Sequence, residues 1–320
     1  MVRTRQQTKS SDQDHPPPEK VEKTSPLTKA RAKAKKPPVS KDPSPSPHSL
    51  GGGNRQDVLA IPGPKGDIAC ITSHPPTDPP VLIFTHGASG NLQTPSLWNF
   101  GDGFGRSKPI LLFQGSMNLK SRTSMFTSII AYLKPTSSTP VTLGGRSMGA
   151  RAAVMAALED KTIKTLILAS YPLTGQKGAT RDQILLELDE GVDVLFISGS
   201  KDSMCDLDEL REVMKKMKAR TWLREVEGAD HGMAVKPNKH TAAVGKITGR
   251  VAATWMDERE SLSRDEVLTW AEEVEEDVKD KKTIDEKAND KKRAAESDQE
   301  TPTNNDHAGG SKKKRRRKAR

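Results

Sequence analysis

A serine between two glycines, at the junction of an apolar run and an alanine-rich stretch, constrains the fold of this chain more than any other feature. Residues 144–150 are Gly-Gly-Arg-Ser-Met-Gly-Ala, and they directly follow the apolar run 140–143. Chance alone produces a Gly-x-Ser-x-Gly in about one in ten chains of this length. The context makes the motif more specific, because a sharp strand-to-helix turn brings the serine close to neighbouring backbone and requires small residues on both sides. We therefore predict such a turn at Ser147, with Gly145 and Gly149 providing the space.

The pattern of apolar residues around this turn predicts a layered fold. Strands are expected at about 58–61, 67–72, 81–85, 110–114, 140–144, 163–169, 193–198 and 220–225, and helices at about 122–133, 148–158, 181–188, 205–218 and 239–256. Continuous apolar runs such as 110–113 suit strands that are covered on both faces, as in a parallel sheet. An opening hairpin followed by alternating strands and helices predicts an α/β fold with a mostly parallel central sheet flanked by helices.

Composition confines the core to the middle of the chain. Hydrophobic residues make up 33% of the sequence, whereas ordinary globular domains have about 45–50%. Eleven of the 12 aromatic residues lie between Phe84 and Trp255. Residues 1–56 contain nine prolines and 12 basic against 5 acidic side chains, which predicts a disordered, basic, proline-rich tail. The expected organisation is this tail, one domain over 57–257, and a charged C-terminal tail over 258–320.

Several classes of protein are excluded by what the chain lacks. Cys70 and Cys205 are too few for a disulfide framework or a cysteine-based zinc site, so we expect a reducing compartment and no metal. The serine chemistry considered below needs no cofactor, and we expect none. No apolar run approaches the ~20 residues of a membrane helix, and no signal peptide is apparent. We therefore expect an intracellular protein that is not secreted and has no membrane partner. The segment 58–257 holds 23 basic and 19 acidic residues, so any nucleic-acid contact should be weak and made by the tails.

The serine turn predicts two further residues in a fixed order along the chain. In folds with this turn, an acid follows a later strand and a histidine follows the last one. Asp202 lies just beyond the expected strand 193–198, and His231 just beyond 220–225. His231 would take the proton of Ser147 as the serine attacks a carbonyl, and Asp202 would orient the imidazole. These three residues are the candidate catalytic set.

Such a reaction also needs donors for the oxygen that becomes negatively charged. The expected strand 81–85 is followed by His-Gly-Ala-Ser-Gly, whose small residues let the backbone approach a substrate. We assign the donors as the N–H groups of Met148 and Ala88. His86 and Gly87 are expected to support this loop, since His86 precedes the serine and does not fit the chain order of the base.

The same residues also have simpler interpretations. Ser147 would be a buried turn serine in a non-catalytic protein, and Asp202 would be the N-cap of the helix over 205–218. Cys70 and Cys205 are then a strand residue and a helix-start residue.

Other polar residues compete for the catalytic roles. Asp206 and Asp208 are alternative acids within the helical pattern, and Asp230 is too close in sequence to His231 for the usual geometry. His240 is an alternative base.

Four segments carry a resemblance to a known family: Phe84–Gly90, Gly144–Arg151, Gly199–Asp202 and Gly228–Gly232. They resemble the α/β-hydrolase superfamily, and within it the small, lidless branch related to dienelactone hydrolases. The closer similarity is to the family of the testis-expressed hydrolase-like protein and the third regulatory subunit of the non-specific lethal (NSL) histone acetyltransferase complex. The resemblance covers about 57–257 and implies an eight-stranded, mostly parallel sheet with a serine-hydrolase site. Some members look like scaffolds, which leaves the alternative of a catalytically silent regulatory subunit in a nuclear, chromatin-associated complex.

Chain length between two strands bears on the substrate. About 22 residues separate Ser170 from Asp193, which is too few for a large cap domain. We therefore expect an open, shallow site for a small-molecule or surface-presented acylated substrate.

The tails suggest location and partners. Residues 312–318 are Lys-Lys-Lys-Arg-Arg-Arg-Lys, a run typical of nuclear localisation or nucleic-acid contact, and 29–36 is a second basic patch. We expect a nuclear or nucleocytoplasmic protein with nuclear protein partners bound through the tails.

A further pattern predicts structure within the C-terminal tail. Ser263 and Glu266 form a capping-box pattern, and apolar residues including Trp270 follow at helical spacing. An amphipathic helix is expected over 264–280, packed on the domain, docked on a partner, or solvated.

Overall fold

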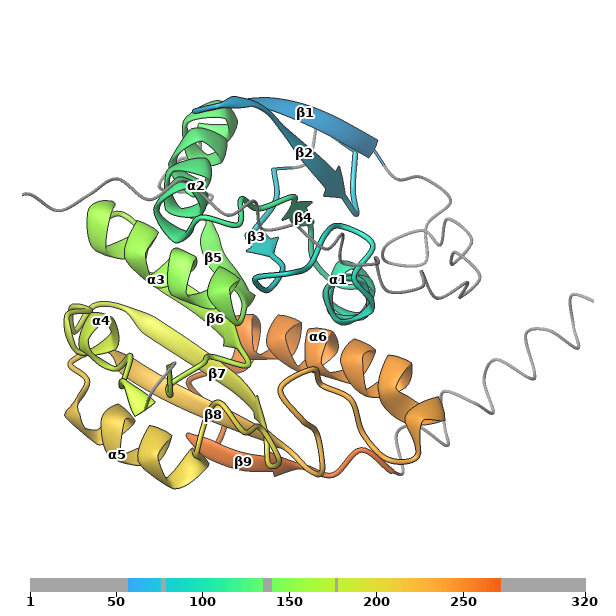
Figure 1. Cartoon of the computed structure of the whole chain (residues 1–320), viewed down its shortest axis with the longest axis vertical. Coiled ribbons are helices and arrows are strands. Elements are labelled where there is room, and N and C mark those ends of the chain that lie inside the picture. The colour runs from blue at the N-terminus through green and yellow to red at the C-terminus, as the bar shows by residue number, and fades with distance from the viewer. Residues whose placement is uncertain (1–56, 76–78, 135–139, 176–177, 272–320) are drawn as a thin grey trace, which may run out of the picture. The chain divides into compact units, whose positions relative to one another are not determined.

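The structure, a computed structural model, describes residues 57–75, 79–134, 140–175 and 178–271. Within them a nine-stranded sheet has the order β1-β2-β4-β3-β5-β6-β7-β8-β9 (Figure 1). The strands are β1 (Asp57–Gly63), β2 (Gly66–Thr72), β3 (Leu82–Thr85), β4 (Ile110–Phe113), β5 (Thr142–Arg146), β6 (Thr165–Ala169), β7 (Asp193–Gly199), β8 (Arg220–Val226) and β9 (Asp265–Leu268). The first eight coincide with the predicted strands to within two residues at every end.

The direction of the strands confirms the predicted architecture. β1 and β2 form the opening antiparallel hairpin, and β2 pairs antiparallel with β4. All other neighbouring strands are parallel. The parallel strands β3 and β4 are buried at every residue, because helices cover both faces of such a sheet. The carboxyl ends of the parallel strands therefore meet along one edge, where the predicted site residues follow them.

Helices cover the two faces in two separate layers (Figure 1). They are α1 (Pro95–Gly105), α2 (Leu119–Leu133), α3 (Met148–Glu159), α4 (Gln183–Leu186), α5 (Leu207–Lys216) and α6 (Thr241–Glu258), with a short 3-10 helix at Asn238–His240. Residues of α2, α3 and α5 share one hydrophobic cluster, whereas α1 and α6 share the other. Successive residues of β3 alternate between the clusters, with Ile83 in the first and Leu82 and Phe84 in the second, as the period of a strand requires.

Helix α1 was not predicted from the sequence. Its sequence contains three glycines, which weaken a helical pattern. Those glycines serve packing: a Cβ on Gly103 would lie 1.9 Å from the Lys246 carbonyl oxygen of α6, and one on Gly249 would lie 2.1 Å from the carbonyl oxygen of Phe100. The backbones of α1 and α6 therefore approach closely at positions where only glycine fits.

The predicted helix over 264–280 is wrong at its start. Residues 265–268 form β9, which pairs in parallel with β8 and extends the sheet beyond the predicted domain end at 257. The exposed edge of β8 offers unpaired backbone groups, and the Leu223 N–H donates to the Arg264 carbonyl at 2.7 Å. This pairing outweighs the local capping-box pattern, and the sheet has nine strands instead of the eight implied by the resemblance. Residues 272–280, like both basic runs of the tails, lie outside the described residues.

Candidate active site

The turn at Ser147 has the strained geometry that the flanking glycines predict. Ser147 lies between β5 and α3 with φ of 53° and ψ of −114°, a conformation that is costly for a residue with a side chain. A Cβ on Gly145 would lie 2.4 Å from the Gly149 carbonyl carbon, and one on Gly149 would lie 2.7 Å from the carbonyl oxygens of His86 and Thr85. Both glycines are therefore required sterically for the turn to pack against the loop after β3.

The structure brings Ser147, His231 and Asp202 together. The Ser147 Oγ lies 2.9 Å from His231 Nε2, and His231 Nδ1 lies 2.9 and 2.8 Å from the two carboxylate oxygens of Asp202. The Asp202 side chain is fully buried, whereas that of His231 is 24% exposed. A neutral imidazole that donates from Nδ1 to the carboxylate has a free lone pair at Nε2 for the serine hydroxyl. This arrangement is suited to removing the proton from Ser147.

The competing acids have other contacts. Asp206 is the N-cap of α5, where its Oδ1 accepts from the N–H groups of Asp208 and Glu209. Asp230 Oδ1 accepts from the N–H groups of Gly232 and Ala234. The capping role considered for Asp202 thus belongs to Asp206, although Asp202 also accepts from the Met204 N–H.

The competing histidine lies elsewhere. His240 precedes α6, and its ring centroid is 5.5 Å from that of Trp270. The indole of Trp270 in turn donates to the Glu227 carbonyl. The base considered as an alternative is therefore in a different environment from Ser147.

His86 is a buried support of the loop after β3. Its Nε2 accepts from the Gly115 N–H at 2.9 Å, so Nδ1 carries the proton that is donated to the Gly87 carbonyl at 2.7 Å. Burial lowers the pKa of His86 to about 4, the Gly87 contact opposes this shift, and the Arg122 charge adds to it. His86 is therefore neutral at pH 7 and holds the loop beside the serine.

A family model described as an alpha/beta hydrolase domain matches residues 118–257, the range that includes all three residues of the candidate set. The chain has the α/β-hydrolase fold. In the described sheet, β5 is the central one of the nine strands, and Ser147 directly follows it.

Solved structures of this fold are similar along most of their length. A dienelactone hydrolase from Anabaena variabilis superposes with a TM-score of 0.51 at 14% identity, over 64% of this chain and 97% of the other. An esterase from Pyrobaculum calidifontis superposes with a TM-score of 0.51 at 13% identity, over 65% of this chain and 86% of the other. At these identities the likeness concerns the fold.

The backbone around Ser147 has the elements needed to bind an oxyanion. Met148 is the first residue of α3, whose amino end carries unpaired N–H groups and the positive end of the helix dipole. On the facing loop, a Cβ on Gly87 would lie 3.5 Å from the Ser147 Cβ. Ala88 follows Gly87 and is exposed. The two segments named for the oxyanion donors thus meet at the serine.

No group of three His, Cys, Asp or Glu side chains that would hold a metal occurs in the part of the α/β-hydrolase fold that the structure describes. Cys70 and Cys205 are both buried free thiols, and burial raises the pKa of each to about 12. Neither is a nucleophile at neutral pH. Among helices in the described ranges, none is long and apolar enough to cross a membrane.

Two arginines at the site were missed by sequence reasoning. Arg122 of α2 donates from Nη1 to the His86 and Gly87 carbonyls and from Nε to the Ser116 carbonyl. Nothing in the polar sequence around it indicates a buried residue. Arg146 precedes Ser147 directly, and its position in the glycine motif was the available clue.

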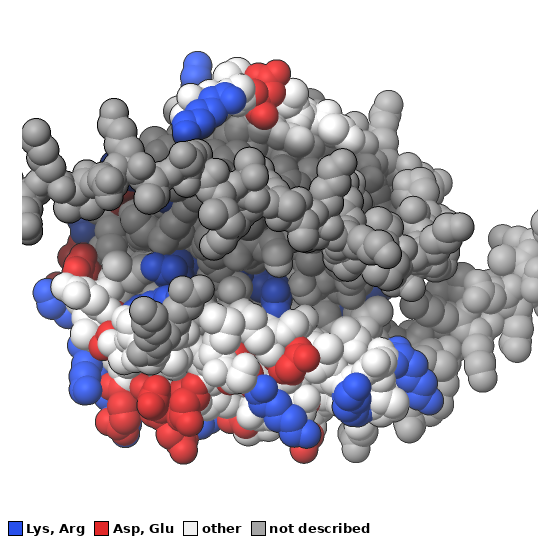
Figure 2. All heavy atoms as spheres, viewed as in Figure 1, with Lys and Arg blue, Asp and Glu red and all other residues white. Residues whose placement is uncertain are grey.

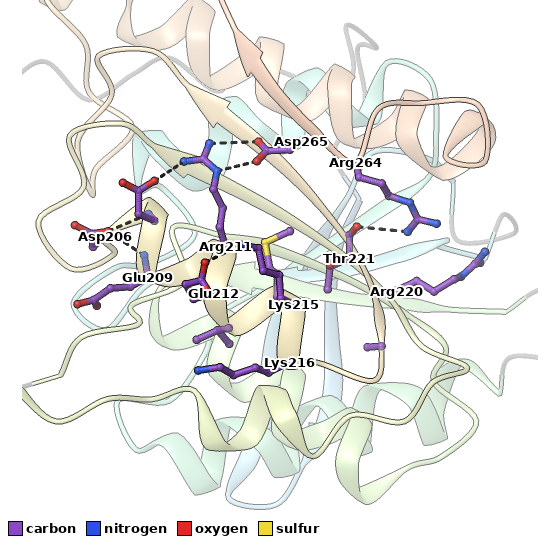
Figure 3. A pocket seen from close by; sticks show the side chains of 14 residues that line it. Asp206, Glu209, Arg211, Glu212, Lys215, Lys216, Arg220, Thr221, Arg264 and Asp265 are labelled. Carbon is purple, nitrogen blue, oxygen red and sulfur yellow. Dashed lines mark hydrogen bonds and ion pairs between the residues drawn. The ribbon is translucent and has the colours of Figure 1, made fainter.

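The face seen in Figure 1 carries scattered Lys and Arg, while Asp and Glu gather where α5 lies (Figure 2). A groove between α5, β8 and β9 is lined largely by charged side chains (Figure 3). Within this groove Arg211 donates to Asp265 at 2.7 Å and to Glu225 at 2.8 Å, and pairs with Asp208 at 3.2 Å. The groove lies on the outer edge of the α/β-hydrolase fold and includes none of the three candidate residues.

Proposed function

We propose that this chain is a serine hydrolase that cleaves an ester, thioester or amide through an acyl-Ser147 intermediate. The observation that carries the proposal is the continuous hydrogen-bonded chain from Ser147 Oγ through both ring nitrogens of His231 to Asp202. A strained serine at a strand-to-helix turn adds support, since such strain is found at functional sites.

Each group of the site has a defined role in the proposed reaction. Ser147 Oγ attacks the carbonyl carbon while His231 Nε2 takes the hydroxyl proton, and the N–H groups of Met148 and Ala88 donate to the oxyanion. His231 then gives that proton to the departing alcohol, thiol or amine, which leaves acyl-Ser147. Water attacks this ester, His231 takes the water proton, and the carboxylic acid is released as Ser147 regains its proton. Asp202 keeps the imidazole oriented and stabilises its protonated form throughout.

The test is labelling of the purified protein by a fluorophosphonate probe, which reacts with activated serines. We expect the wild type to be labelled and both Ser147→Ala and His231→Ala to lose labelling. Ser124→Ala is a matched control, because this α2 hydroxyl bonds only the Lys120 carbonyl of its own helix. A folded wild type that resists the probe would overturn the proposal and favour the catalytically silent scaffold.

We also propose that this chain is related to the family of the NSL regulatory subunit. In this proposal the protein is located in the nucleus and binds protein partners through its tails. The basic run 312–318 supports import, and 29–36 supplies a second basic patch. Deleting 312–320 should lower the nuclear fraction of a fluorescently tagged chain. An unchanged nuclear fraction in a variant that also has 29–36 replaced by neutral residues would overturn this part.

A further inference from the structure

Arg146 is a cation beside Ser147, and buried nitrogens of its guanidinium have no hydrogen-bond partner. Its Nε and Nη2 atoms are buried and make no hydrogen bond. Among the described residues, no hydrogen bond or ion pair involves the Arg146 side chain, although its backbone belongs to β5 and pairs with β6. Buried donors without partners are costly, and the cost is greater for a charged group. Such an arrangement is expected where a ligand supplies the missing acceptor.

The guanidinium lies on the same side of the loop after β3 as the nucleophile. The position of a Cβ on Gly87 is 3.6 Å from Arg146 Nη1 and 3.5 Å from the Ser147 Cβ. Gly87 leaves this space open, and both groups border it. A substrate whose carbonyl carbon reaches Ser147 therefore brings its adjacent atoms close to Arg146.

The nearby carboxylates do not neutralise Arg146 by direct pairing. Burial lowers the pKa of Arg146, while the negative charges of Asp202 and Asp230 oppose this effect. The Asp202 carboxylate contacts His231 and the Met204 N–H, and Asp230 accepts from two backbone N–H groups of its own turn. Both carboxylates are thus engaged elsewhere, and neither bonds to the Arg146 guanidinium.

Two fully buried arginines of the fold have side-chain partners, whereas Arg151 of α3 also has a buried Nε without one. Arg122 donates to three carbonyl groups, and Arg224 donates to the Leu223 and Ser263 carbonyls and pairs with Glu266 at 3.3 Å. Each keeps one unpartnered nitrogen, Nη2. Their contacts account for them as structural residues, whereas nothing within the described protein accounts for Arg146.

We propose that Arg146 binds a negatively charged group of the substrate next to the scissile carbonyl, so that the substrate is an anionic ester, thioester or amide. This inference rests on the proposed hydrolase function. The ligand group is a carboxylate or phosphate, because the fork of a guanidinium matches two oxygens of either. Arg146 is assigned to substrate selection, while proton transfer remains with His231.

The experiment measures the hydrolysis of two pairs of esters, which are nitrophenyl esters in the first pair and acetyl esters in the second. The two members of each pair differ mainly by one negative charge. In the first pair the acyl group is a glutarate half-ester or its neutral methyl ester. In the second pair the leaving group is hydroxybenzoate or hydroxybenzamide. We expect kcat/KM of the wild type to favour the anionic member of at least one pair by about 10- to 100-fold, as charge-assisted hydrogen bonds are among the stronger ones.

The variants are Arg146→Gln, Arg146→Lys and the control Lys161→Gln. We expect Arg146→Gln to lower kcat/KM on the anionic esters far more than on their neutral counterparts, so that the anionic preference is lost, and Arg146→Lys to retain part of it. Lys161→Gln removes an exposed charge, paired with Asp189, at the amino end of β6 and should leave the preference unchanged. If Arg146→Gln does not fold, the preference of the wild type and its reduction in Arg146→Lys still test the inference.

The outcomes separate the inference from the function on which it rests. Labelling by the neutral fluorophosphonate probe with equal kcat/KM on charged and neutral esters would overturn the role of Arg146 and leave the hydrolase intact. A preference that persists in Arg146→Gln would also overturn it. Absence of labelling would overturn both. Slower labelling in inorganic phosphate or in acetate, in the wild type but not in Arg146→Gln, would support the inference and identify the anion.

Discussion

Arg146 and Arg211 both lie near carboxylates of the same sheet, yet their surroundings differ. Arg211 lies on the outer edge, beside Asp265 (Figure 3). It also reaches Glu225 and Asp208, and its side chain remains 29% exposed. Arg146, at the carboxyl end of β5, has two buried nitrogens without partners. Side chains of the described residues supply ion-pair partners for the Arg211 guanidinium, whereas they supply none for the Arg146 guanidinium.

This difference separates a structural charge from one available to a ligand. The outer groove is conspicuous on the surface, but its charges already serve to attach β9 to α5 and β8. The region around Ser147 has hydrogen-bond donors without acceptors, a strained backbone and a buried neutral histidine. Each of these features lowers the stability of the folded protein, so stability does not explain their presence. The size of a hollow is therefore a weaker guide to function here than the state of its polar groups.

The largest difference in activity is expected when one aspartate in each region is replaced by asparagine. Asp202→Asn removes the carboxylate that orients His231 and should lower kcat/KM for ester hydrolysis by about a thousand- to ten-thousand-fold. Asp265→Asn should leave hydrolysis unchanged, because Asp265 contacts only the outer groove. Both variants are assayed on one ester after their folding is checked by circular dichroism. Equal losses in the two variants would remove the distinction between the regions.

A pH effect should distinguish His86, beside the serine, from His240, which lies before α6. The folded-state pKa of His86, about 4, is below the ordinary value of 6.5, so the unfolded chain binds the proton more tightly. Stability from this group is complete above pH 6.5 and is lost as the pH falls toward 4, by up to about 3 kcal/mol.

Urea unfolding at pH 7 and pH 4.5 measures this loss. His86→Gln should be less stable at pH 7 but should lose less stability on acidification than the wild type. His240→Gln, outside the site, is the matched control and should follow the wild type. An identical acid-induced loss in His86→Gln would contradict the assignment.

A third contrast concerns backbone packing. Gly149→Ala places a Cβ against two backbone carbonyls and should cost about 1–3 kcal/mol in the free energy of unfolding. Gly191→Ala is the control, since its Cβ would meet only the mobile end of Lys164 at 3.8 Å. Thermal unfolding compares the two, and a tolerated Gly149→Ala would show that the Ser147 turn is less tightly packed than the geometry indicates.

The smallest effect is expected in the outer groove. Arg211→Gln removes a partly exposed cluster of ion pairs and should cost about 1 kcal/mol or less, because solvent screens such pairs. The difference from the wild type should shrink further in about 1 M salt, while hydrolysis stays constant. A loss of activity with intact folding would link the groove to the site and weaken the comparison.

Much of the architecture could be predicted from local pattern and chain order. The runs at Leu82–Thr85 and Ile110–Phe113 indicate doubly covered strands, and the glycines around Ser147 indicate the sharp turn. The order of Ser147, Asp202 and His231 along the chain indicates a common site, because consecutive parallel strands end at one edge of a sheet. These features depend on side-chain periodicity, steric size and topology, all of which are present in the sequence.

Tertiary contacts decided what local pattern did not. Glycines that weaken α1 as a helix are the residues that let it approach α6, and the free edge of β8 made a strand of residues 265–268 despite their capping-box pattern. The tautomer of His86 and the missing partners of Arg146 likewise depend on groups distant in the chain. The sequence by itself determined the layers, the serine turn and the order of the site residues, because these follow from local sterics and strand direction. Only the tertiary structure decided which charges are paired, because pairing depends on distances between elements that no local pattern encodes.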